Sequence, residues 1–146
     1  MIIAKSDIKL IHFGVAELNY KCDFPSNAKP LSGELEVDLN YDIFKIDPNK
    51  NIFQLVLDLK LFPPDGFSGY SINLKLFGVF EIPLSEDKKQ IDSALLHTCL
   101  PLILGYSRGF IAEITSHFPI GKYLLPSLSV GSILEANKNK SAPNKE

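Results

Sequence analysis

Apolar and polar residues alternate along two stretches in the first half of the chain. In residues 34–41 and again in residues 53–61, every second side chain is apolar, and most of the side chains between them are charged or amide. A period of two is that of a β-strand with one face buried and the other in water. We therefore predict two half-buried strands, the first with an acidic outer face.

Two further stretches carry the same pattern less regularly. Residues 8–20 predict one strand with a bulge near Gly14, and residues 70–76 predict a strand that bends at Gly78. Pro, Gly, Asn and Asp favour turns, and the connecting stretches 23–33, 47–51 and 62–69 are rich in these residues. Short strands joined by such turns predict a four-stranded antiparallel sheet.

From Ile91 onward the apolar residues recur every three or four positions, which predicts a long α-helix. One apolar stripe consists of Ile91, Leu95, Cys99, Leu102, Tyr106, Phe110, Ile114 and Phe118. A second stripe lies on another face and consists of Leu96, Leu100, Ile103 and Ile111. A helix that is apolar almost all round cannot face water. Because the sheet of one subunit can cover one stripe, we expect the second stripe to meet another copy of the chain.

Capping and helix-breaking residues predict the limits of this helix. Ser85 is the expected N-cap, and Pro101 is expected to kink the helix or divide it in two. After Pro126 a short apolar stretch predicts a second helix. Strands followed by helices indicate the α+β class: a four-stranded antiparallel sheet, a long Pro-interrupted helix and a short C-terminal helix. We expect one domain over residues 1–135 and a disordered polar tail over residues 136–146.

Composition narrows the function classes. A net charge of −2 on 146 residues argues against nucleic-acid binding, which favours a basic excess. No uninterrupted apolar run approaches the ~18 residues of a membrane span, and no secretory signal is evident, so we expect a cytoplasmic protein without membrane insertion. Cys22 and Cys99 are interpreted as packing residues and not as a disulfide or a zinc site.

Catalytic patterns are not found in the sequence. His12, His97 and His117 are scattered, and no acid accompanies any of them at an informative spacing. No nucleophile elbow and no phosphate-binding glycine loop is present. We expect a protein that is not an enzyme and that needs no cofactor or metal.

A surplus of apolar and aromatic residues lies outside the regular elements. They are Phe62, Phe67, Tyr70, Tyr123, Leu125, Leu128, Val130, Ile133 and Leu134. If part of this set lines an exposed groove, the groove would bind extended apolar peptide segments. The alternative, that these residues close the core, is equally compatible with the pattern.

The second half of the chain resembles a known family. The motifs, in order, are Phe77-Gly78-Val79-Phe80-Glu81-Ile82, His97-Thr98-Cys99-Leu100-Pro101, Gly105-Tyr106-Ser107-Arg108-Gly109-Phe110-Ile111, Phe118-Pro119 and Leu124-Leu125-Pro126. This series is similar to the C-terminal half of the SecB export chaperones. The resemblance implies a homotetramer, assembled as a dimer of dimers through sheet edges and long helices. It also implies ATP-independent holding of unfolded preproteins in apolar grooves.

The chain departs from the family at positions that the resemblance links to the export motor ATPase. Two acidic positions of the family hold Asn19 and Asn73 here, and only Asp23 is kept. Glu34, Glu36 and Asp38 still make the outer face acidic and are an alternative docking surface. These departures favour a dedicated client, such as an unstable antitoxin, over general export. The contrasting hypothesis is a scaffold that binds one folded partner.

Overall fold

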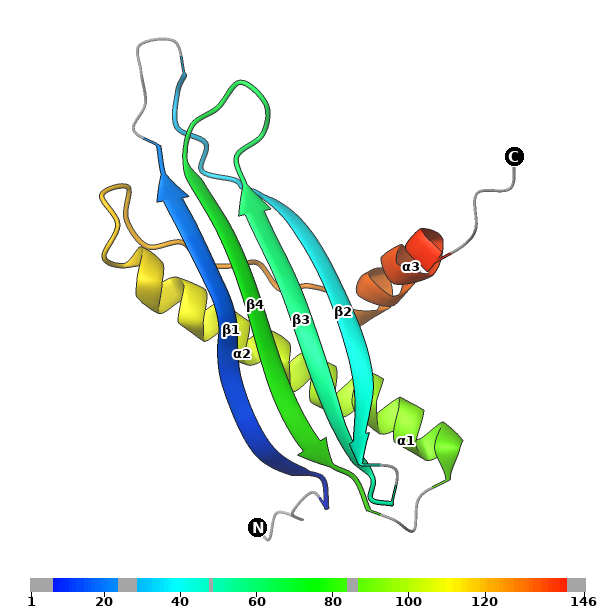
Figure 1. Cartoon of the computed structure of the whole chain (residues 1–146). Helices are drawn as coiled ribbons and strands as arrows, with labels where there is room; N and C mark the ends of the chain where they lie inside the picture. The colour runs from blue at the N-terminus through cyan, green and yellow to red at the C-terminus, as the bar shows by residue number, and fades with distance from the viewer. Residues whose placement is uncertain (1–6, 24–28, 48, 84–86, 142–146) are drawn as a thin grey trace, which may run out of the picture.

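The computed structural model describes residues 7–23, 29–47, 49–83 and 87–141. Its four strands are β1 (Lys9–Cys22), β2 (Glu36–Asp47), β3 (Ile52–Phe62) and β4 (Tyr70–Glu81). They form one antiparallel sheet in the order β1-β4-β3-β2, with all helices on the same face of the sheet (Figure 1). The predicted fold class is confirmed.

The two central strands provide most of the core. Alternate residues of β3 and β4 are buried under the helices, and the residues between them form the outer face of the sheet. The buried residues are Phe53, Leu55, Leu57, Leu59, Leu61, Tyr70, Ile72, Leu74, Leu76 and Phe80. On β2, an edge strand, the inward residues are only partly buried because no strand lies beyond it. Because of this partial burial, inward residues of β2 remain accessible at the edge of the sheet.

One of the two predicted glycine roles is confirmed. In β1 the register shifts lie on either side of Gly14, between Leu10 and His12 and between Val15 and Glu17, so a bulge near Gly14 is observed. At Gly78 the pairing with β3 is regular. A Cβ at Gly78 would lie 2.5 Å from Cδ1 of Ile103, so this glycine permits close approach of the helix to the sheet.

The N-cap of the long helix lies two residues after the predicted one. Asp87 is the N-cap of α1 (Lys88–Ala94), and its carboxylate accepts the N–H of Gln90 at 2.8 Å. The side chain of Gln90 in turn accepts the N–H of Asp87, which completes a capping box. The predicted cap, Ser85, lies outside the described residues.

Pro101 divides the helix through a π-helical turn. The five residues of η1 (Leu95–Cys99) separate α1 from α2 (Leu100–Thr115), and the N–H of Leu100 donates to the carbonyl oxygen of Leu95, five residues earlier. Proline lacks an N–H and its ring crowds the carbonyl four residues before it, so a wider turn at this point avoids both problems. The expected kink or division at Pro101 thus takes the form of one inserted residue within a continuous helical stretch, Lys88–Thr115.

This inserted residue rotates the helix by about 100° relative to a regular α-helix. Up to Cys99 the buried residues belong to the first predicted stripe. After Cys99 the buried face follows the second stripe. Leu100, Ile103 and Ile111 are fully buried against the sheet of their own subunit, and Leu96 is half-buried. The prediction that these residues meet another copy is therefore wrong for the three buried ones.

The outward side of α2 carries residues of the first stripe. Leu102 is 42% exposed and Tyr106 is 41% exposed. Phe13 of β1 stacks on Tyr106 with ring centroids 4.4 Å apart. The helical stretch Lys88–Thr115 is 28 residues long, enough to span a membrane by length and composition. Packing on the sheet accounts for the buried part of this stretch, such as Leu100, Ile103 and Ile111.

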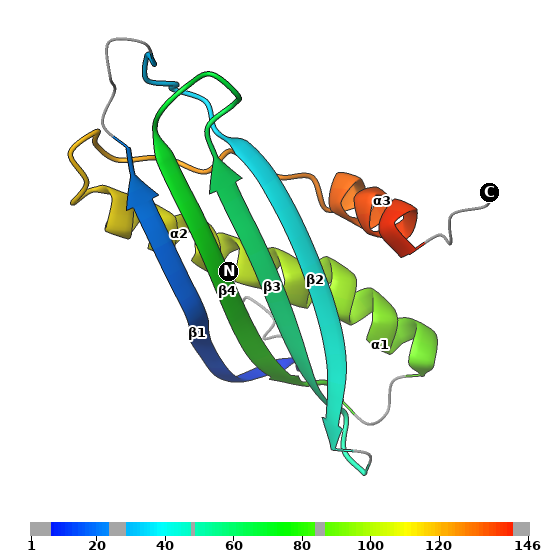
Figure 2. The same cartoon turned by 45° about the horizontal axis from the view of Figure 1, so that its top comes forward.

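The last helix, α3 (Val130–Ser141), lies beside the β2 edge of the sheet and contacts that strand (Figures 1 and 2). It continues beyond the domain end predicted at residue 135, because adding residues to a formed helix needs little further ordering. Residues 142–146 of the predicted tail lie outside the described residues, so their disorder stays a prediction.

Candidate functional site

Residues 116–129, here called the crossing segment, return over the helical side of the sheet from the β1 edge to the β2 edge (Figures 1 and 2). They contain no regular helix or strand. Three side chains from flanking elements bind its backbone. Tyr70 of β4 donates to the carbonyl oxygen of Gly121, Thr115 accepts the N–H of Tyr123 at 2.8 Å, and Arg108 donates to the carbonyl oxygen of Leu125 at 3.2 Å. The segment is thus held at three points.

Aromatic contacts fix the beginning of the crossing segment. The ring of Phe118 lies 4.5 Å from that of Tyr20 and 5.1 Å from that of Tyr70, measured between centroids. Gly121 has a φ of 100°, which side-chain-bearing residues rarely adopt, so glycine favours this turn. Burial raises the pKa of the Tyr70 hydroxyl, as does Cys22 to a lesser degree, so Tyr70 remains a neutral hydrogen-bond donor.

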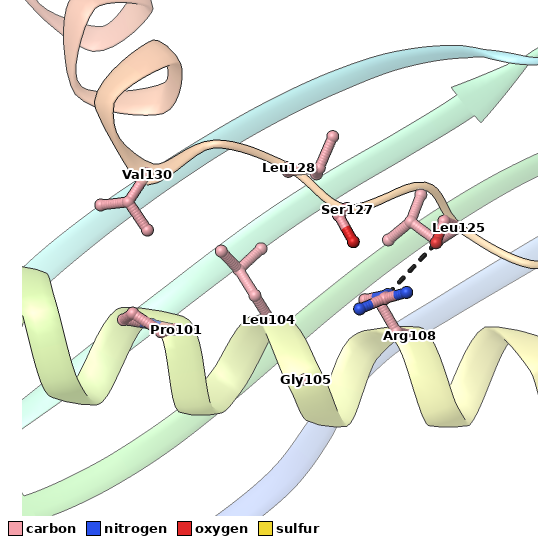
Figure 3. A pocket seen from close by; sticks show the side chains of 8 residues that line it. All are labelled: Pro101, Leu104, Gly105, Arg108, Leu125, Ser127, Leu128 and Val130. Atoms are coloured by element: carbon pink, nitrogen blue, oxygen red, sulfur yellow. Dashed lines mark hydrogen bonds between the residues drawn. The ribbon is translucent and has the colours of Figure 1, made fainter.

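A cavity of about 230 Å³, here called the α2 pocket, lies between α2 and the crossing segment (Figure 3). Its lining residues are Pro101, Leu104, Gly105, Arg108, Leu125, Ser127, Leu128 and Val130. Most of them are apolar. The polar side chains, Arg108 and Ser127, point toward each other from opposite walls at one end of the cavity (Figure 3).

A second cavity of about 240 Å³, here called the β2 pocket, lies between β2 and the start of α3. Its lining residues are Val37, Asp38, Leu39, Leu128, Ser129, Ser132, Ile133 and Ala136. Leu128 lines both pockets, which together are called the groove. Each pocket is smaller than the ~300–1,000 Å³ of typical small-molecule sites. Their size suits single side chains of a longer ligand.

Four of the nine residues predicted to bind peptide line this groove: Leu125, Leu128, Val130 and Ile133. Leu125 and Ile133 are almost fully buried, so they support the walls and expose little surface to a ligand. Leu128 and Val130 are half-buried and accessible from the groove. A peptide-binding role for these residues stays a prediction.

The other five predicted residues lie elsewhere. Tyr70 and Tyr123 line a third, smaller cavity of about 130 Å³ near the ends of the strands. Tyr70 is 5% exposed, so it belongs to the core and is not a surface for a client. Phe62 and Phe67 are exposed at the connection between β3 and β4, and Leu134 lies on α3. The structure does not bring the nine residues together in one surface.

Several groove residues were missed in the sequence. The alternation in residues 34–41 predicts only that Val37 and Leu39 face the core, and their position on an edge strand opens them to the β2 pocket. Leu104 belongs to the all-round apolar part of the helix, which predicts burial but not its partner. Arg108 stands in the sequence only as part of the motif of residues 105–111, and its contact with the carbonyl oxygen of Leu125 depends on the fold of the crossing segment.

The four predicted docking acids do not form one acidic surface. Asp23 follows β1 and pairs with Lys21 at 3.3 Å. Glu36 and Asp38 lie on β2, at the opposite edge of the sheet, because β4 and β3 separate β1 from β2. Glu34 precedes β2 and acts electrostatically on Tyr123 of the crossing segment. Lys60 is directly opposite Asp38 in the pairing of β2 with β3. Asp23 and Asp38 thus each have a lysine nearby, Lys21 and Lys60. The second pairing depends on the strand order, which places β3 beside β2.

Both cysteines are free thiols, as their interpretation as packing residues requires. Burial raises the pKa of Cys99 to about 12, so its thiol is protonated and unreactive at neutral pH. Among the described residues no group of three or more His, Cys, Asp and Glu side chains is arranged to hold a metal ion. The groove therefore offers mainly apolar contacts. Its charged groups are Arg108 in the α2 pocket and Asp38 in the β2 pocket.

Comparison with known structures places this geometry in a recognised fold. The structure is similar to that of a SecB-like chaperone of Mycobacterium tuberculosis, solved in complex with a ChAD peptide from an antitoxin. The TM-score is 0.61 and the identity 11%, over 84% of this chain and 91% of that chain. A protein of unknown function from Streptococcus agalactiae is similar with a TM-score of 0.45 and 11% identity, over 86% and 100% of the two chains.

No protein-family model matches the sequence, and no curated protein matches it. At 11% identity the first structural likeness shows the fold and nothing finer. The resemblance found in the sequence motifs is therefore confirmed for the fold: a sheet of four antiparallel strands, a long helix and a short one, arranged as in a SecB-like chaperone.

Proposed function

We propose that the protein is an ATP-independent chaperone that holds unfolded polypeptides in the groove. The observation that carries the proposal is the pair of apolar pockets on either side of Leu128, open at the surface and lined by α2, the crossing segment, α3 and β2. The SecB-like chaperone with a similar fold was solved with a peptide bound, which supports peptide binding by this chain as well.

The groove favours extended, apolar chain segments over folded surfaces. Each pocket has room for about one side chain, a size that suits an extended chain segment better than the surface of a folded domain. Such contacts read hydrophobic character and not a particular sequence. Several grooves on one oligomer would give a tight total affinity from weak individual contacts.

The finer parts of the proposal follow the family resemblance. We propose a homo-oligomer, a dimer or a dimer of dimers, that acts in the cytoplasm without catalysing a reaction. A dedicated client, such as an unstable antitoxin, is favoured over general export because the acidic residues do not gather on one surface. The antitoxin peptide bound to the similar chaperone supports this preference.

The test is aggregation suppression with purified full-length protein. A chemically unfolded, unrelated protein is diluted into buffer, and light scattering is followed with and without the chaperone. Leu128→Asp places a charge where the two pockets meet and is expected to abolish suppression. Ile46→Asp is the matched control, because Ile46 is 51% exposed and lies seven residues along β2 from Leu39, ~23 Å away.

Circular dichroism must first show that both variants are folded. Suppression by the wild type and by Ile46→Asp, together with its loss in Leu128→Asp, supports the groove as the holding site. A wild type that fails to suppress aggregation at molar excess refutes the chaperone proposal. In that case the scaffold hypothesis predicts copurification with a single folded partner.

A further inference from the structure

Arg108 is the cationic side chain of the α2 pocket. Its Nε–H donates to the carbonyl oxygen of Leu125 at 3.2 Å, which uses one of the five N–H donors of the guanidinium group. No carboxylate among the described residues forms an ion pair with it. The other four donors are therefore available at the exposed side of this residue.

The bond to Leu125 holds the guanidinium plane at one end of the pocket. In Figure 3 the Ser127 hydroxyl points into the same space from the crossing segment. Around these two groups the walls are apolar and include Pro101, Leu104 and Leu128. A guanidinium group that is already held in one orientation loses little conformational entropy when it binds a ligand. Its position therefore favours a ligand group of matching geometry.

The group that fits this position is a carboxylate. Its two oxygens match two parallel N–H donors of a guanidinium, and a hydroxyl can donate to the same anion. Arg108 and Ser127 are both exposed, so the carboxylate would bind at the mouth of the pocket, with the apolar walls on one side of it. Because the net charge of the chain is −2, the chain as a whole does not attract anions. A preference for a carboxylate would therefore come from the local charge of Arg108.

We infer that Arg108, with Ser127, binds an acidic side chain of the client, a Glu or Asp within an otherwise apolar segment. This inference rests on the proposed holding of unfolded polypeptides. An internal acidic residue fits better than a terminal carboxylate because the groove continues past Leu128 into the β2 pocket, where the bound chain places its next apolar side chains. Arg108 and Ser127 thus add a preference for an acidic residue to a groove whose other contacts are mainly apolar.

The test compares two fluorescein-labelled peptides with the full-length protein. Both have the same sequence, rich in Leu and Val, and differ in one central residue, Glu in the first and Gln in the second. Binding is measured by fluorescence anisotropy at low salt. The wild type is expected to bind the Glu peptide about tenfold tighter than the Gln peptide. Added salt should reduce this preference.

Arg108→Met keeps an apolar stem but removes the donors. It is expected to bind both peptides equally, with an affinity for the Gln peptide within about twofold of the wild type. Lys60→Met is the matched control, since it removes one positive charge from the outer face of the sheet. It should keep the full preference. If Arg108→Met does not fold, Arg108→Lys retains a charge without the fork and is expected to show a reduced preference.

Equal binding of the two peptides by the wild type overturns the role of Arg108 while the chaperone proposal stands. A preference that survives in Arg108→Met, or that is lost in Lys60→Met, also overturns it. A wild type that binds neither peptide and suppresses no aggregation refutes both proposals.

Discussion

Gly78 shows how one residue sets the distance between the helix and the sheet. It lies on the inner face of β4, opposite Ile103 of α2. A Cβ built there would be 2.5 Å from Cδ1 of Ile103 and 2.8 Å from Cε2 of Phe80, closer than side chains tolerate. Ile103 and Phe80 are almost completely buried, so neither has free space to move into. The position of α2, and with it one wall of the groove, depends on this missing side chain.

Gly78→Ala is therefore expected to lower the free energy of unfolding by about 1–3 kcal/mol, because the added methyl group overpacks the core. The measurement is urea unfolding followed by circular dichroism. Gly131→Ala in α3 is the control, since its Cβ would meet only Ser129 Oγ at 3.6 Å. It should raise stability by up to about 1 kcal/mol through helix propensity. Equal stability of Gly78→Ala and the wild type would contradict the close-approach argument.

The crossing segment is the element on which the groove depends most. It has no backbone pairing of the kind that stabilises a helix or strand, so side chains from its neighbours position it. Thr115, at the end of α2, is fully buried. Its hydroxyl donates to the carbonyl oxygen of Ile111 at 2.7 Å and accepts the N–H of Tyr123 at 2.8 Å. One hydroxyl thus connects the helix end to the segment that lines the groove.

Thr115→Val keeps the shape of the side chain and removes the hydroxyl. The Tyr123 N–H loses its acceptor, and we expect a loss of about 1–3 kcal/mol in the free energy of unfolding. Thr98→Val is the control, because Thr98 is exposed on the same long helix, and its effect should stay within about 0.5 kcal/mol. Both values come from urea unfolding curves. A Thr115→Val variant as stable as the wild type would show that the bond to Tyr123 does not hold the segment.

For the molecule as a whole, the outward side of the long helix is one of the apolar surfaces that a single chain leaves exposed. Leu102 is 42% exposed and Tyr106 41%, and at Gly105 and Gly109 an added Cβ would meet no atom within 4 Å. The π-turn brings these residues outward by shifting the buried face to Leu100 and its successors. An oligomer of this protein would cover them, in place of the residues predicted from the second stripe.

Leu102→Glu is expected to dissociate such an oligomer, because the charge would be buried without a partner at the interface. Light scattering coupled to size exclusion should show the molar mass falling from a multiple of the single-chain value to that value. Leu124→Glu, at an apolar residue of the crossing segment that is 69% exposed and lies on neither a sheet edge nor the long helix, should leave the mass unchanged. A wild type with the mass of one chain at high concentration would contradict the proposed assembly.

Much of the fold could be predicted from the sequence because it depends on local periodicity. The alternation in residues 34–41 and 53–61 gave two strands with the correct inward residues, among them Leu55 and Leu57. The change to a helical period after Ile91 gave the long helix, and Pro101 gave the place where it changes. In each case neighbouring residues alone decide the conformation, through side-chain direction and backbone sterics.

The site depended on contacts between elements, which no local pattern contains. Val37 and Leu39 line the groove only because β2 lies at the edge of the sheet. The π-turn, an extra residue in the helix, exchanged the buried and exposed stripes and turned Leu100 and Ile103 inward. The sequence by itself thus determined which segments are strands and helices. Tertiary structure decided which side chains remain accessible, because burial depends on the neighbour that covers each face.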